Sequence, residues 1–262
     1  MGKIISVANQ KGGVGKTTTA INTAVSMSSY CQSVLIIDFD PQSNTTSGFG
    51  FDKNESKENI YKSMVGEIPV EEIIKPTEVD WVDIIPSNID LIGAEVELVN
   101  MESREIMLKN IINPLRDSYD FIFIDCPPSL GLLTVNALVA SDSILIPIQC
   151  EYYALEGMAQ LLRTINRIRQ NFNKDLALEG VALTMYDSRL NLSDQVVSEM
   201  RKFFGDKVYK TVIPRNVRLA EAPSFGKPAL LYDKTSRGTL AYIELAKELL
   251  EKNGGGNEKS SR

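Results

Sequence analysis

The strongest constraint on the fold is a series of short, mostly apolar runs that alternate along the chain with stretches of helical periodicity. One of them, Phe121-Ile122-Phe123-Ile124, has no polar position, which indicates burial on both faces of a strand. Strands are expected over residues 3–8, 33–38, 82–85, 119–125, 143–148, 178–184 and 208–213. The alternation predicts an α/β fold with a doubly wound, mostly parallel sheet flanked by helices on both faces.

The helical periodicity is clearest over residues 155–172. Leu155, Met158, Leu162 and Ile165 recur there at spacings of three and four residues, as on one face of a helix. No repeat or linker interrupts the pattern before its end, so we expect a single domain over residues 1–252. Residues 253–262 are polar and glycine-rich, and we expect them to form a disordered tail.

The amino-acid composition excludes several classes of function. The chain of 262 residues has no histidine, which excludes imidazole-based hydrolases and histidine-ligated zinc or haem. Cys31, Cys126 and Cys150 are far apart and odd in number, so they form neither a disulfide framework nor a CxxC pair. No apolar run approaches the roughly 18 residues of a spanning helix. We therefore expect a cytoplasmic protein without a membrane partner.

The overall charge hides a local asymmetry. There are 28 basic and 34 acidic residues, a net charge of −6, which by itself argues against a nucleic-acid partner. Residues 201–237 nevertheless contain nine basic and three acidic residues, a net charge of +6 that leaves −12 for the remainder. The segment therefore permits binding to the phosphates of DNA.

A glycine-rich segment follows the first expected strand and opens a helix. In this context glycines let successive backbone N–H groups point at a phosphate, and the helix N-terminus adds its positive end. Lys16 would neutralise the β and γ phosphates, and the Thr17 hydroxyl would ligate Mg²⁺. The segment lacks the first glycine of the generic pattern, where Gln10 stands, and has a second lysine inside the loop. The nucleotide-binding residues expected here are Lys11, Gly12, Gly13, Val14, Gly15, Lys16, Thr17 and Thr18.

Carboxylates follow two of the expected strands. Asp38 and Asp40 end the second strand, and Asp125 ends the strand formed by 119–125. Ligands bind beyond the carboxyl ends of the strands in open α/β sheets. Asp125 is placed as a Walker B aspartate, which would hold Mg²⁺ through a water molecule.

The segment from Lys11 to Thr18 resembles the deviant Walker A motif of the ParA/Soj/MinD family. The resemblance implies ATP or ADP with Mg²⁺ as ligands, weak ATPase activity, and a dimer in which Lys11 reaches the partner's nucleotide. It also implies that Asp40 orients the attacking water, so Lys11, Lys16 and Asp40 are the expected catalytic residues. Asp38 could instead serve as a supporting residue, and the sequence alone does not decide which of the two aspartates is catalytic.

The resemblance extends over residues 3–250 and is specific to the ParA/Soj branch. It rests on residues 136–138, 149–157 and 212–228, the last of which has no counterpart in MinD proteins. In the family, Pro214 and Asn216 would contact adenine. The family also implies nonspecific DNA binding, ATP-dependent homodimerisation, a ParB-type partner that stimulates hydrolysis, and a location on the nucleoid. The DNA-binding residues expected on this basis are Arg189 and Arg218, extended by Lys227, Lys234 and Arg237.

Three alternatives remain open. A MinD-like ATPase of the cell-division site would need a basic amphipathic C-terminal helix, whereas Leu240, Ile243, Leu245 and Leu249 here alternate with residues of mixed charge. A metabolic P-loop enzyme would need a substrate pocket, and an iron–sulfur reductase would need paired cysteines. A DNA-binding regulator with vestigial ATPase activity would carry an N-terminal helix-turn-helix domain, but the first strand starts by Lys3.

Overall fold

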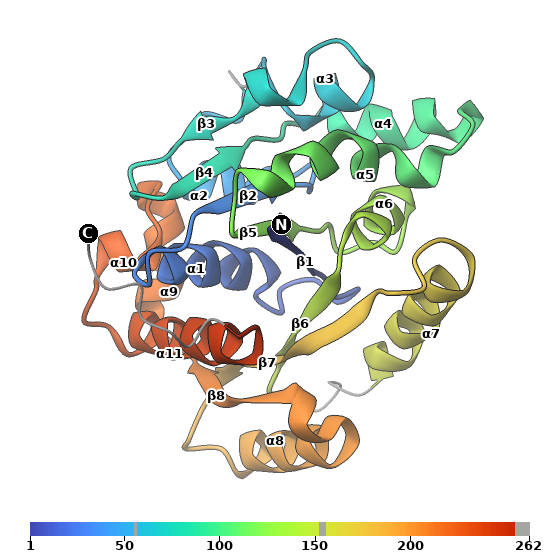
Figure 1. The fold of residues 1–262 in the computed structure, drawn as a ribbon. Helices are drawn as coiled ribbons and strands as arrows, with labels where there is room; N and C mark the ends of the chain where they lie inside the picture. The colour runs from blue at the N-terminus through green and yellow to red at the C-terminus, as the bar shows by residue number, and fades with distance from the viewer. Residues whose placement is uncertain (55–56, 152–155, 255–262) are drawn as a thin grey trace.

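The computed structural model describes residues 1–54, 57–151 and 156–254, and its centre is an eight-stranded sheet. The strand order is β3-β4-β2-β5-β1-β6-β7-β8, and every neighbouring pair is parallel except β3 and β4 (Figure 1). The strands are β1 (Lys3–Val7), β2 (Val34–Asp38), β3 (Lys75–Pro76), β4 (Val82–Ile85), β5 (Phe121–Asp125), β6 (Ser143–Gln149), β7 (Ala177–Tyr186) and β8 (Val208–Pro214). The predicted fold is confirmed. The sequence missed only β3, a two-residue antiparallel edge strand too short to give a periodic signal.

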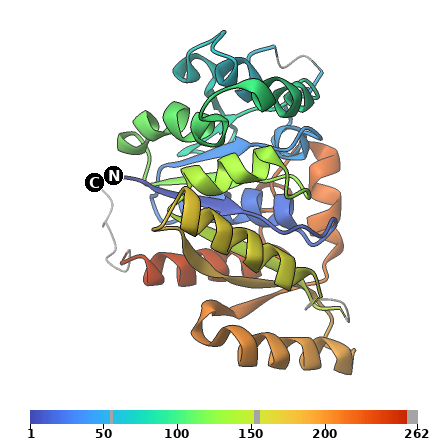
Figure 2. The same ribbon diagram turned by 90° about the vertical axis from the view of Figure 1, so that its right-hand side faces the viewer.

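Helices cover both faces of the sheet, and neighbouring residues of each strand point to opposite layers. Ile5 packs with α1 and α11 in one core, and Ile4 packs with α5, α6 and α7 in the other. Figure 1 shows α1 and α11 side by side, and Figure 2 shows α6 and α7 on the other face. The α-helices are α1 (Lys16–Ser28), α2 (Asn44–Gly48), α3 (Ile60–Met64), α4 (Leu91–Glu97), α5 (Met107–Ile112), α6 (Leu132–Ala140), α7 (Glu156–Asn171), α8 (Asn191–Phe204), α9 (Val217–Glu221), α10 (Ala229–Tyr232) and α11 (Arg237–Lys252).

Short 3₁₀ helices complete the connections between these elements. They are η1 (Val70–Ile73), η2 (Leu98–Asn100), η3 (Arg104–Ile106), η4 (Asn113–Asp117), η5 (Gly205–Lys207) and η6 (Ala222–Phe225). None of the described helices is long and apolar enough to cross a membrane.

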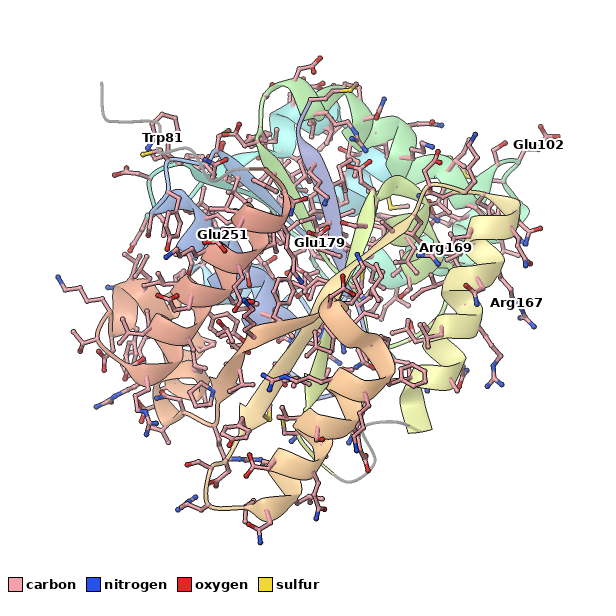
Figure 3. All side chains as sticks on the ribbon, turned by 60° about the horizontal axis from the view of Figure 1, so that its bottom comes forward. Trp81, Glu102, Arg167, Arg169, Glu179 and Glu251 are labelled. Atoms are coloured by element: carbon pink, nitrogen blue, oxygen red, sulfur yellow. The ribbon has the colours of Figure 1, made fainter. Side chains whose placement is uncertain are left out.

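One detail at the end of α11 differs from the sequence-based expectation. Asn253, expected to begin a disordered tail, donates from Nδ2 to Glu179 Oε1 and to the Leu249 carbonyl, both at 2.7 Å. Glu179 lies in the interior of the sheet region (Figure 3). The rest of the predicted tail, from residue 255, and Leu155 lie outside the described residues.

Candidate nucleotide site and basic surface

The glycine-rich loop joins β1 to α1 and is held by bonds to two other strands. Gly13 and Gly15 have φ angles of +73° and +89°, in the region that favours glycine and lets the chain curl. Asn9 Nδ2 donates to the Pro147 carbonyl at 2.7 Å, and the Thr184 hydroxyl donates to the Val14 carbonyl at 2.8 Å. The loop is therefore fixed to β6 and β7 before any ligand arrives.

Lys16 opens α1 at the centre of the site, and only 7% of its surface is exposed. Its Nζ donates to the Lys11 carbonyl at 3.2 Å. Burial lowers the pKa of the Lys16 ammonium, while the nearby charges of Asp125 and Asp40 act in the opposite direction. A poorly solvated ammonium of this kind gains strongly from a phosphate ligand.

Asp125 ends β5, and the parallel pairing sets it directly beside Asp38 on β2 and Val7 on β1. It is fully buried, and its Oδ2 accepts from the Thr45 hydroxyl at 2.7 Å. Its Oδ1 has no hydrogen-bond partner among the described residues. Burial raises the pKa of Asp125 to about 6, whereas the hydroxyls of Thr45 and Thr17 lower it. A buried acceptor without a partner, beside Thr17, fits a magnesium ion or a water bound to it.

Asp38 and Asp40 have different surroundings. Asp38 Oδ2 accepts from the Thr46 amide and hydroxyl at 2.7 and 2.6 Å, and its Oδ1 accepts from the Asp40 amide at 3.2 Å. Burial and the neighbouring Asp125 raise the pKa of Asp38 to about 7. Asp40 Oδ1 accepts from the Gln42 amide at 2.9 Å. Asp38 thus holds the segment that follows β2 in shape, which favours Asp40 as the residue that faces the nucleotide.

A cavity of about 160 Å³ lies beside the loop and brings the predicted adenine contacts together. Pro214 ends β8, and Asn216 caps α9 by accepting the Arg218 amide at 2.8 Å. The lining is mostly apolar, which suits a planar base. It consists of Gly15, Thr18, Thr184, Met185, Ile213, Pro214, Arg215, Asn216, Leu219, Ala220 and Tyr242.

Several residues that support the site were not among those predicted from the sequence. Thr45 and Thr46 hold Asp125 and Asp38, Thr184 holds the loop, and Tyr242 lines the cavity. The hydroxyls of Thr45 and Thr46 lie soon after Asp40 in the sequence, which was the one available signal. Thr184 and Tyr242 come from distant strands and helices, so no local pattern marks them.

The basic residues of segment 201–237 do not lie together. Strand β8 divides them into two groups. The first group lies before β8 or near its start and consists of Arg201, Lys202, Lys207 and Lys210; the second lies after β8 and consists of Arg215, Arg218, Lys227, Lys234 and Arg237. Seven residues of strand span about 20 Å. Each group keeps a net charge of about +3, since Asp206 belongs to the first and Glu221 and Asp233 to the second. The +6 segment of the sequence is therefore two weaker basic regions.

The two predicted DNA-binding arginines, Arg189 and Arg218, lie near the second basic region, which follows β8. Arg189 follows β7 and Arg218 follows β8, and the register pairs Tyr186 of β7 with Pro214 of β8. Lys227 lines a separate groove of about 510 Å³ that reaches Thr17. Lys234 is exposed before α11, and Arg237 begins that helix.

Both arginines are paired with carboxylates of this chain. Arg189 Nη2 lies 2.6 Å from Asp187 Oδ2, and Arg218 Nη1 lies 2.9 Å from Glu221 Oε2. Arg218 Nε also lies 3.4 Å from Asp233 Oδ2. Such exposed pairs contribute only about 0–1 kcal/mol, so a DNA phosphate can replace the carboxylate at low cost.

The basic region touches the segment that follows β2 through two glycines. A Cβ on Gly226 would lie 2.7 Å from Gly50 Cα, and the φ angles of Gly226 and Gly50 are +63° and +83°. Gly50 follows α2, which carries Thr45 and Thr46. Backbone therefore packs on backbone between the nucleotide site and the segment that carries Lys227.

The sequence and the fold of the chain are similar to those of several known proteins. A family model described as an AAA domain matches residues 2–178. The chain is 56% identical to the sporulation initiation inhibitor protein Soj of Bacillus subtilis, over 95% of this chain and 98% of that protein. It is 52% identical to the chromosome partitioning protein ParA of Myxococcus xanthus, over 96% and 89% of the two chains. A structure of cobyrinic acid a,c-diamide synthase from Mycobacterium smegmatis with ADP and magnesium superposes with a TM-score of 0.87, at 34% identity and 98% coverage of both chains.

Proposed function

The chain belongs to the ParA/Soj family of chromosome-partitioning ATPases, and we propose that it is a nucleotide-switched DNA-binding ATPase that positions chromosomal or plasmid DNA. ATP binding gives a sandwich dimer that binds DNA without sequence preference. A ParB-type partner then stimulates hydrolysis, and the dimer releases DNA. The protein acts in the cytoplasm, on the nucleoid.

The unpartnered Oδ1 of buried Asp125, beside Lys16 and Thr17, is the observation that carries the proposal. The Thr17 hydroxyl would hold Mg²⁺ directly, and Asp125 would hold it through a water molecule. When bound, the ion would neutralise charge on the phosphates. The loop amides and Lys16 bind the phosphates, and the cavity at Pro214 and Asn216 takes the base.

Hydrolysis rests on position and electrostatics, because the chain has no histidine. Asp40 orients the attacking water, and the segment around it is held by the bonds that Asp38 accepts. Lys11 reaches the nucleotide of the second protomer. Such a site hydrolyses ATP slowly until the partner completes it.

The similarity to an amide-forming synthase structure does not favour that activity here. Curated relatives named Soj or ParA reach 45–56% identity over nearly the whole chain, compared with 34% for the synthase structure. DNA binding is supported by Arg189, Arg218 and the basic residues after β8, whose phosphate contacts carry affinity without sequence information.

Binding to a random-sequence DNA duplex, measured with ATP, with ADP and without nucleotide across a salt series, tests the proposal. We expect tight binding with ATP alone and a steep loss of affinity as salt increases. Equal binding in all three nucleotide states would contradict the switch.

Two variants test which aspartate serves hydrolysis. Asp40→Ala is expected to give an ATP-locked dimer that holds DNA and releases negligible phosphate. Asp38→Asn keeps an acceptor for the Thr46 amide and hydroxyl, so we expect it to retain measurable turnover. The opposite ranking of phosphate release would assign the catalytic role to Asp38.

A further inference from the structure

Ser87 is a buried residue that links the end of β4 to the segment that carries the predicted catalytic aspartate. Strand β4 ends at Ile85, and the parallel register places Ile85 beside Ile37 of β2 (Figure 1). The chain therefore leaves β4 at the same edge of the sheet where Asp40 follows β2. Ser87 is not among the residues that we assign to binding of nucleotide or DNA.

Ser87 makes two hydrogen bonds to the chain that follows β2. Its hydroxyl donates to the Asp40 carbonyl at 3.1 Å, and its amide donates to Thr46 Oγ1 at 3.0 Å. A longer contact of 3.5 Å joins the same hydroxyl to the Asn88 carbonyl. We call residues 40–46 the Asp40 segment. Ser87 holds this segment at both of its ends.

The bonds form a closed ring that passes through Asp38. Thr46 donates from its amide and its hydroxyl to Asp38 Oδ2 at 2.7 and 2.6 Å, and the Asp40 amide donates to Asp38 Oδ1 at 3.2 Å. Asp38, Asp40, Thr46 and Ser87 are all buried, so bulk water does not readily replace a bond that is lost. The ring fixes both the amide and the carbonyl of Asp40.

The Asp40 segment contains a strained residue that depends on its surroundings. Ser43 is buried and has a φ angle of +55°, in the left-handed region that is unfavourable for a residue with a Cβ. Such a conformation persists only where surrounding contacts hold it. The Ser43 amide donates to the Asp40 carbonyl at 2.9 Å, but this bond is local to the segment. Ser87 is 47 positions away from Asp40 and anchors the same carbonyl to the end of β4.

We infer that Ser87 is a positioning residue for hydrolysis, whose hydroxyl holds the backbone of Asp40 so that the Asp40 carboxylate meets the attacking water. This inference rests on the proposed function, in which Asp40 orients that water. Because Ser87 is fully buried, it acts through Asp40 and not through contact with the nucleotide. It should therefore affect the rate of hydrolysis and not the binding of ATP. A misplacement of about 1 Å can slow a reaction that depends on position by roughly a hundredfold.

Ser87→Ala tests the inference, because it removes the hydroxyl and leaves the amide bond to Thr46 in place. ATPase rates of the full chain are measured with Mg²⁺ and DNA over a series of ATP concentrations. We expect kcat to fall about tenfold, while KM for ATP and ATP-dependent dimerisation by light scattering stay within twofold of the wild type. A role confined to folding would not separate kcat from KM in this way.

Ser141→Ala is the matched control. Ser141 is also buried, and its hydroxyl donates to the Ala137 carbonyl at 2.8 Å, so the variant loses a bond of the same kind. Ser141 lies just before the start of β6, at the edge of the parallel sheet opposite to Asp40. Its kcat should stay within twofold of the wild type. Equal losses of kcat in the two variants would contradict the inference.

Asp40→Ala separates the inference from the proposed function. Negligible hydrolysis in Asp40→Ala together with a normal kcat in Ser87→Ala contradicts the positioning role alone. Normal hydrolysis in Asp40→Ala contradicts the proposed role of Asp40, and the positioning role with it. A raised KM or a loss of dimerisation in Ser87→Ala would place Ser87 in ATP binding and would also overturn the inference.

Discussion

The nucleotide site and the basic surface lie near each other but are built in opposite ways. At the nucleotide site, Lys16, Asp38 and Asp125 are buried, and hydroxyls and backbone groups fix their neighbours. At the basic surface, Arg189 and Arg218 are exposed and paired with nearby carboxylates. The first region is organised before the ligand binds, whereas in the proposed function the arginines of the second region exchange weak carboxylate partners for DNA phosphates. Single changes should therefore have larger effects at the first.

Lys16→Ala should have the largest effect. Removal of a buried cation from a phosphate site costs about 3 kcal/mol or more, a loss of ATP affinity of roughly a hundredfold or more. Isothermal titration calorimetry checks this, and dimerisation and DNA binding should disappear with it. Lys11→Ala is the control, which should bind ATP but remain monomeric by light scattering. Retained ATP affinity in Lys16→Ala would show that the preorganised site is not the nucleotide site.

Gly226→Ala tests the contact between the two regions. The left-handed backbone and the approach to Gly50 together should cost about 2–4 kcal/mol of unfolding free energy, measured from urea denaturation. Gly66→Ala separates the two causes, because Gly66 has a φ angle of +78° and a Cβ added there would meet nothing within 4 Å. It should cost about 1 kcal/mol. Equal losses in both variants would mean that the close approach contributes nothing.

Arg218→Glu should weaken DNA binding without changing the stability of the fold. We expect DNA affinity with ATP to fall tenfold or more, while the unfolding free energy changes by less than about 0.5 kcal/mol. The salt dependence should also become less steep. Arg201→Glu, on the other side of β8, is the control and should retain DNA binding. Equal losses in both variants would mean that the two basic regions act as one surface.

Asp38→Asn should change the pH dependence of stability in the absence of nucleotide. The pKa of Asp38 is raised from 3.8 to about 7, so the folded state holds a proton that the unfolded state has lost between those values. Wild-type stability should therefore fall as pH rises through this window, and the variant should lose less. Urea midpoints at pH 5 and pH 8 measure the difference. Parallel profiles would show that Asp38 is not the titrating group.

The main elements of the site could be predicted because local sequence encodes them. The glycines before Lys16 follow a strand and open a helix, and Asp125 ends an apolar run, so local sequence patterns predicted where these residues lie in the structure. The division of the basic segment could not be predicted. Its charges are continuous in the sequence, and only the course of β8 separates them. The bonds from Thr45 and Thr184 also required the fold, since their partners are distant along the chain.

The sequence by itself determined the buried strands, the phosphate loop and the absence of imidazole chemistry, because periodicity and motifs act over a few residues and composition needs no fold. Tertiary structure decided which oxygen of Asp125 lacks a partner, how Asp38 differs from Asp40, and how β8 divides the basic segment. These properties depend on desolvation and on contacts across the sheet. Neither exists until distant parts of the chain are packed together.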